Sequence, residues 1–164
     1  IAIKLRFDPI VVYYDKQGRL CDNLEHFEAV MRVASELGIK SVIFAFCITY
    51  PKVVNRMAKR GFNLKQLTVD EQKKTLDHLI DVCEHYGIQL QTCCNSQLIN
   101  YRQHVGASKC IDGDVINQLC HGQLKTTRKD TGQRKECGCM TSRDIGGYIM
   151  KCGHRCSYCY ANPT

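Results

Sequence analysis

Twelve cysteines stand in this chain of 164 residues, and three of them have a spacing that suits metal chemistry. The run Cys152-Gly-His-Arg-Cys156-Ser-Tyr-Cys159 separates its cysteines by three and then two residues. Two tight loops of this kind can turn three thiolates toward one point. Three thiolates suit three irons of a [4Fe-4S] cluster and leave the fourth iron open to a substrate or cofactor. The spacing therefore predicts Cys152, Cys156 and Cys159 as metal ligands.

A second set of cysteines lies upstream of this triplet. Cys137 and Cys139 form a C-x-C pair, which can serve one metal or two neighbouring ones, and Cys93, Cys94 and Cys110 come earlier in the chain. We interpret Cys137, Cys139, Cys93 and Cys110 as candidate ligands of a second metal or cluster. Their spacing is a weaker signal than that of the triplet.

Two other readings of the triplet remain open from spacing alone. A structural zinc site completed by His154, Cys137 or Cys139 is as compatible with the ligand types as an iron-sulfur cluster. Disulfides would need an oxidising compartment. The clustering of the thiols in one tail, and a first segment without the apolar stretch of a secretory signal, disfavour disulfides.

The elements expected to position these cysteines alternate between strands and helices. Apolar and β-branched runs predict strands, periodic apolar residues predict helices, and glycines end the helices. A capping box at Thr68-Val-Asp-Glu71 opens one of the helices. The expected strands are 3–7 with a continuation at 10–14, then 41–47 and 88–93; the expected helices are 24–37, 51–59 and 68–86, with weaker ones at 97–104 and 112–120.

This β-α-β-α-β-α order predicts an α/β fold with a parallel sheet and right-handed crossovers. Three strands cannot close a barrel, and an open sheet of three strands would leave an edge exposed. We therefore expect residues 1–121 to be β/α repeats that form part of a (β/α) barrel. The first residue is isoleucine, so we also expect the parent protein to have an N-terminal part before it.

The chain changes character after Cys120. Residues 122–164 are polar, basic and glycine-rich, without periodicity, and hold five cysteines. A structureless stretch of this length is unusual unless it is functional, disordered or organised by a ligand. We expect an irregular, Cys-rich C-terminal tail that binds metal and packs on the barrel.

Several motifs of the chain resemble the bacterial domain-of-unknown-function family 1848. The C-terminal part carries GQRKECGCMTSRDIG over 132–146, the Cys152 triplet and YCYAN over 158–162; RFDPI at 6–10, YPK at 50–52 and KCID at 109–112 match in order. The resemblance covers essentially the whole chain, as the C-terminal part of such a protein. It implies a barrel related to radical S-adenosylmethionine (SAM) enzymes.

The resemblance also implies a function. The cluster on the triplet would bind SAM at its open iron, with Tyr158 as a cofactor contact, and a reduced cluster would cleave SAM to start radical chemistry on a small-molecule or unknown substrate. Arg6 and Asp8, at the carboxyl end of a barrel-type strand, and Asp144 are the candidate catalytic residues. In radical SAM enzymes the motif normally lies near the N-terminus, whereas here it is C-terminal. The alternative function is a non-catalytic module with a structural zinc.

Charge and hydropathy limit the classes of partner that the sequence permits. The formal charge is +7, and a basic run between Lys125 and Lys135 permits contact with nucleic acid, but no aromatic residues interleave it, so a polar linker is favoured. The longest apolar run, 42–48, is far below the roughly 20 residues of a membrane span. We expect a cytoplasmic protein without a membrane segment.

Overall fold

A computed structural model describes residues 3–143, 152–159 and 161. Its main sheet has four parallel strands in the order β1 (Leu5–Ile10), β4 (Ser41–Phe46), β6 (Gln89–Thr92) and β7 (Val105–Ala107). Each strand pairs with the next one along the sheet in chain order. The described residues do not close a barrel.

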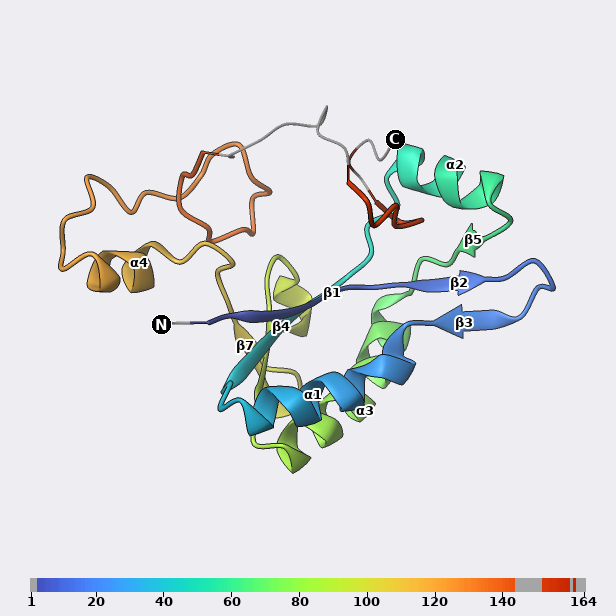
Figure 1. Cartoon of the computed structure of the whole chain (residues 1–164), viewed down its shortest axis with the longest axis horizontal. Helices are drawn as coiled ribbons and strands as arrows, with labels where there is room; N and C mark the ends of the chain where they lie inside the picture. Colours follow the sequence, from blue (N-terminus) through green and yellow to red (C-terminus); the bar gives the residue numbers. More distant parts are fainter. Residues whose placement is uncertain (1–2, 144–151, 160, 162–164) are drawn as a thin grey trace.

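Two helices cover one face of this sheet. α1 (Phe27–Glu36) and α3 (Val69–His85) lie together on one side, as Figure 1 shows. Val42 and Phe44 of β4 belong to the same buried cluster as Phe27 and Leu79 from these helices. Burial of large apolar side chains is the dominant favourable contribution to folding, so this layer is the core of the molecule.

The opposite face of the sheet carries a different set of residues. Successive side chains of a strand point to opposite faces, so Ile43 turns away from the helices that cover Val42 and Phe44. Arg6, Gln91 and Gly106 align with Ile43 across the four strands and share its face. This face is therefore the one available to the later, irregular part of the chain.

A second, smaller sheet stands beside the first. It is antiparallel, in the order β3 (Leu20–Asp22), β2 (Val12–Tyr14) and β5 (Asn63–Leu64). The Asn23 side chain fixes the corner between β1 and β2, because it accepts from the Val11 amide at 2.9 Å and donates to the Pro9 carbonyl at 3.0 Å. Helix α2 (Pro51–Lys59) contacts β5, and helix α4 (Gly113–Leu119) follows β7.

The parallel sheet and the alternation of elements are confirmed, the helix predicted over 97–104 is wrong, and two features were not predicted. The sheet has a fourth strand, β7, directly after the segment 97–104. That segment forms two short 3-10 turns, Ser96–Leu98 and Tyr101–Gln103, because Asn100 and Arg102 adopt left-handed backbone angles that no α-helix contains. The small antiparallel sheet was not predicted either.

A first prediction concerns the capping box of α3. The Thr68 hydroxyl accepts from the Glu71 amide at 3.3 Å, and a Glu71 carboxylate oxygen accepts from the Thr68 amide at 2.9 Å. Thr68→Ala should lower the free energy of unfolding by about 1 kcal/mol, because it leaves a helix amide without its acceptor. Urea titration of Thr68→Ala and Thr68→Asp checks this. Equal losses in both variants would contradict it, since aspartate retains the cap.

No helix among the described residues is long and apolar enough to cross a membrane.

Candidate metal centre

Five cysteines meet at the carboxyl end of the parallel sheet. We call Cys93, Cys94, Cys110, Cys137 and Cys139 the five-cysteine site. The sulfurs of Cys93, Cys94 and Cys137 lie within 4.8 Å of one another, and so do those of Cys93, Cys110 and Cys139. Cys93 is thus common to two sets of three thiols.

The ends of two strands supply three of these residues. Cys93 and Cys94 directly follow β6, and Cys110 follows β7. Adjacent side chains of an extended strand point to opposite faces, but Cys94 has a φ of 61°, which breaks that alternation. The Cys93 and Cys94 sulfurs therefore face each other at 3.5 Å.

The other two residues come from the segment after α4. Cys137 and Cys139 are buried and pack with Cys93 against Ile43, on the face of the sheet that the helices leave open. The Met140 amide donates to the Ile111 carbonyl at 3.0 Å, so this segment is tied to the chain next to Cys110. Figure 1 shows the segment on the side of the sheet opposite α1 and α3.

Backbone amides point at three of the five sulfurs. The Ile111 amide donates to the Cys139 sulfur at 3.3 Å, the Cys110 amide donates to Cys93, and the Cys139 amide donates to Cys137. Hydrogen bonds to the charged form of a group favour that form. These amides therefore favour thiolates at the site.

The thiols do not titrate alike. Hydrogen bonds from Cys110 above all, and from Cys94 and Cys137, lower the pKa of Cys93 to about 5 despite its burial. The pKa of Cys110 is raised because its proton is held in the bond to Cys93, and burial raises the pKa of Cys94 to about 12. The lowered pKa of Cys93 and the raised pKa values of Cys110 and Cys94 belong to one set of interacting thiols, whose first proton is lost more readily than that of an isolated thiol.

Three cations act on the site electrostatically. Arg6 interacts with Cys93 and Cys110, Lys109 with Cys139, and Arg134 with Cys94. Arg6 also forms an ion pair with Asp8, which leaves the guanidinium between a carboxylate and the thiols. The site is a buried, sulfur-rich centre whose negative charge has partners on several sides.

The predicted triplet, Cys152, Cys156 and Cys159, lies away from the five-cysteine site, in a segment that packs beside α2. Cys152 is exposed, whereas Cys156 and Cys159 are half-buried. The triplet does not form a set of sulfurs within 4.8 Å, although all three residues are among those described. It is separate from the five-cysteine site.

Two arginines of the α2 region hold the backbone around the triplet. Arg56 donates to the carbonyl oxygens of Cys159 and Ala161, and Arg60 donates to the Arg155 carbonyl at 2.9 Å. Tyr158 packs against a buried cluster that includes Val53 of α2. The tail segment is therefore docked through side chains far from it in sequence, as Figure 1 shows beside α2.

Tyr158 is surrounded by thiols. Its hydroxyl is hydrogen-bonded to Cys156, and Cys47 and Cys159 lie near enough to act on it electrostatically. Burial is the main cause of its raised pKa. Cys47 is the residue directly after β4, and it is half-buried rather than part of the main core.

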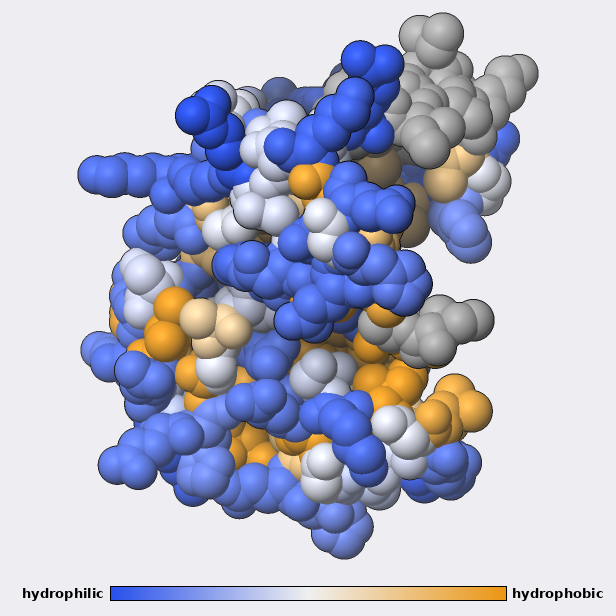
Figure 2. All heavy atoms as spheres, turned by 90° about the vertical axis from the view of Figure 1, so that its left-hand side faces the viewer, coloured by the Kyte–Doolittle hydropathy of each residue, from blue (hydrophilic) through white to orange (hydrophobic). Residues whose placement is uncertain are grey.

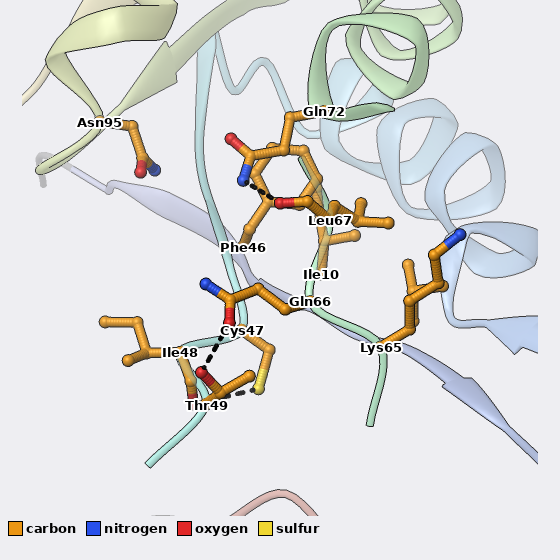
Figure 3. A pocket seen from close by; sticks show the side chains of 11 residues that line it. Ile10, Phe46, Cys47, Ile48, Thr49, Lys65, Gln66, Leu67, Gln72 and Asn95 are labelled. Atoms are coloured by element: carbon orange, nitrogen blue, oxygen red, sulfur yellow. Dashed lines mark hydrogen bonds between the residues drawn. The ribbon is translucent and has the colours of Figure 1, made fainter. Parts of the chain in front are cut away.

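A cavity of about 140 Å³ opens at the carboxyl ends of β1 and β4. Figure 3 shows Cys47, Gln66, Gln72 and Asn95 around it, with the Thr49 hydroxyl donating to Gln66. Gln72 donates to the Leu67 carbonyl at 3.2 Å, and its side-chain oxygen is buried without a partner. The lining combines apolar walls with neutral amides and one charged residue, Lys65, whose ammonium group is paired with Glu71 at 2.8 Å.

The remaining predicted site residues lie in different parts of the structure or outside the described residues. Arg6 and Asp8 are paired with each other on the open face of the sheet, and Arg6 neighbours the five-cysteine site rather than the triplet. Asp144 lies outside the described residues. Cys94 was not among the candidate ligands, although its position next to Cys93 was a signal for it.

A comparison with family models gives one match, to a domain of unknown function (DUF1848), over residues 1–161. No curated protein and no solved structure matches the chain. The match spans almost the whole sequence, including both groups of cysteines. The chain therefore belongs to the DUF1848 family.

Proposed function

We propose that this chain is an iron-sulfur protein of the radical SAM-like type, in which Cys152, Cys156 and Cys159 bind a [4Fe-4S] cluster with one open iron. One observation carries the proposal. Cys137 and Cys139, two of the three residues that could complete a zinc site at the triplet, are buried against Cys93, which leaves only His154 for that role. The triplet is then left with three thiolates, the number that leaves one iron free.

The placement of the triplet supports the same function. The docked tail brings Tyr158, which lies close to Cys156 and Cys159, near Cys47 at the carboxyl end of β4. Active sites of (β/α) barrels collect at the carboxyl ends of the strands. We interpret the parallel sheet as part of such a barrel, with strands in chain order from one edge to the other.

Three cysteines at this spacing can bind three irons of a [4Fe-4S] cluster and leave the fourth iron open. When bound, such a cluster supplies the electron for reductive cleavage of SAM. Arg56 and Arg60 would hold the loop that presents the thiolates.

The 140 Å³ cavity is the proposed place of a small-molecule substrate. Its neutral amides suit a substrate with uncharged hydrogen-bonding groups. Arg6 and Asp8 remain proposed as catalytic residues on the adjoining face.

The test is anaerobic purification of the chain with iron, sulfide and zinc analysis. We expect a brown protein with about four irons and four sulfides per chain. Its absorbance should bleach on reduction with dithionite, and SAM should change its electron paramagnetic resonance spectrum. A colourless protein that holds zinc at the triplet and contains no sulfide would overturn the proposal in favour of a structural zinc module.

A further inference from the structure

The geometry points to a second metal centre of another kind: the five-cysteine site binds zinc or a similar soft divalent ion and fastens residues 121–143 to the sheet. This inference does not rest on the proposed cluster. The five-cysteine site and the triplet have no residue in common. The ligands come from two strand ends and one loop.

The distances between the sulfurs favour a single ion over a cubane. In a tetrahedral zinc site with Zn–S bonds of about 2.3 Å, the sulfurs stand about 3.8 Å apart. In both sets of the five-cysteine site all sulfurs lie within 4.8 Å of one another. Small side-chain rotations bring such a set onto one ion, whereas a cubane would have to push the thiols apart within a buried site.

The position of Cys93 makes it the central ligand. It belongs to both sets of three thiols, whereas Cys94 and Cys137 belong to one and Cys110 and Cys139 to the other. Any ion bound by either set therefore needs Cys93. Three thiolates plus a further thiol or water complete the four positions that zinc prefers.

Apart from its two buried cysteines, the segment that provides Cys137 and Cys139 is held by backbone and polar contacts, such as the bond from the Met140 amide to the Ile111 carbonyl. Within residues 121–143, all of them described, Cys137 and Cys139 are the only buried residues. Regular pairing is limited to a bridge between Lys129 and Met140. Figure 2 faces this side of the molecule, and hydrophilic side chains dominate its upper part. A segment without an apolar core gains its order from a metal crosslink in the way that small zinc domains do.

The hydrogen-bond donors and charged side chains around the sulfurs also suit a bound metal. Backbone amides donate to Cys93, Cys137 and Cys139. Such donors orient ligands and offset the negative charge of thiolates. Lys109 and Arg134 add positive charge from outside the site. Metal uptake releases the thiol protons to solvent.

The experiment measures zinc in the chain with Cys152, Cys156 and Cys159 all replaced by serine, so that the proposed cluster cannot contribute. We expect roughly one to two zinc ions per chain, according to whether one or both sets are filled. Cobalt in place of zinc should give the intense visible bands of tetrahedral thiolate coordination. Adding Cys93→Ser should remove most of the metal and these bands, whereas adding Cys120→Ser, an exposed cysteine outside both sites, should not.

A second readout follows the loop itself and does not depend on a variant folding. Residues 121–143 contain several trypsin sites, including Lys125, Arg128 and Arg134. Removal of zinc by a chelator should speed cleavage there by at least about tenfold, since cleavage follows local opening. Zinc content that survives Cys93→Ser, or a cleavage rate in this segment that the chelator leaves unchanged, would overturn the inference.

Discussion

Replacing Cys156 with serine should abolish the iron-sulfur absorbance of the protein and its response to SAM. Cys156 is the middle ligand of the proposed cluster, and two remaining thiolates cannot hold three irons of a cubane. The Tyr158 hydroxyl is hydrogen-bonded to this thiol, so the substitution also removes the sulfur from that contact. The measurement is iron and sulfide per chain after anaerobic reconstitution.

The matched control is Cys120→Ser, which removes an exposed thiol outside both groups of cysteines. It should reconstitute like the unchanged chain. Zinc at the five-cysteine site should be the same in Cys156→Ser and in the control, because the two centres share no ligand. Full iron and sulfide content in Cys156→Ser would show that the triplet is not the cluster site.

The second large effect lies in the core, at Phe44. This side chain of β4 is 0% exposed, and its ring meets that of Phe46 edge to face at a centroid distance of 5.8 Å. Phe44→Ala should lower the free energy of unfolding by about 3–5 kcal/mol, because it removes a buried ring and leaves a cavity. Since small domains are stable by only about 5–15 kcal/mol, much of the variant should be unfolded at 37 °C.

Urea unfolding followed by far-ultraviolet circular dichroism measures this loss, at fixed zinc concentration because bound metal shifts stability. Leu119→Ala is the control: the residue is 59% exposed, so its truncation should change the unfolding free energy little. A loss below about 1 kcal/mol at Phe44 would mean that β4 is not the centre of the core.

The sequence predicts best those elements whose local pattern and tertiary role agree. Helix α2 begins and ends where expected, at Pro51 and Lys59, since proline favours the first helical turn and Gly61 follows the end. The uninterrupted apolar run at β4 reflects a strand covered on both faces, by the helices at Phe44 and by cysteines at Ile43. In α2 and β4 the local sequence is therefore enough to predict the element.

The elements that were missed depend on contacts between distant residues. β7 has three residues, one of them Gly106, and it is a strand because it pairs with Leu90 to Thr92 of β6. β5 has only two residues and exists through its pairing with β2. No periodicity can appear in segments this short, so only the tertiary fold defines them.

The candidate site also has a part that the local sequence predicts and a part that depends on the tertiary fold. Spacing predicted the triplet and suggested Cys137, Cys139, Cys93 and Cys110 as a second group, but it could not show which of these thiols lie close together in space. That grouping follows from the parallel sheet, which places the ends of β6 and β7 side by side. The arginines that dock the tail were not foreseen, because Arg56 lies 103 residues from Cys159.

The most direct test of the account is a metal and sulfide inventory of three proteins purified in parallel without oxygen: the unchanged chain, the chain with Cys152, Cys156 and Cys159 replaced by serine, and Cys93→Ser. We expect iron, sulfide and zinc in the unchanged chain and zinc alone in the triple serine variant. Cys93→Ser should hold iron and sulfide but little zinc. Loss of the same metal in both variants would contradict two separate centres, and absence of bound metal from all three would contradict the account as a whole.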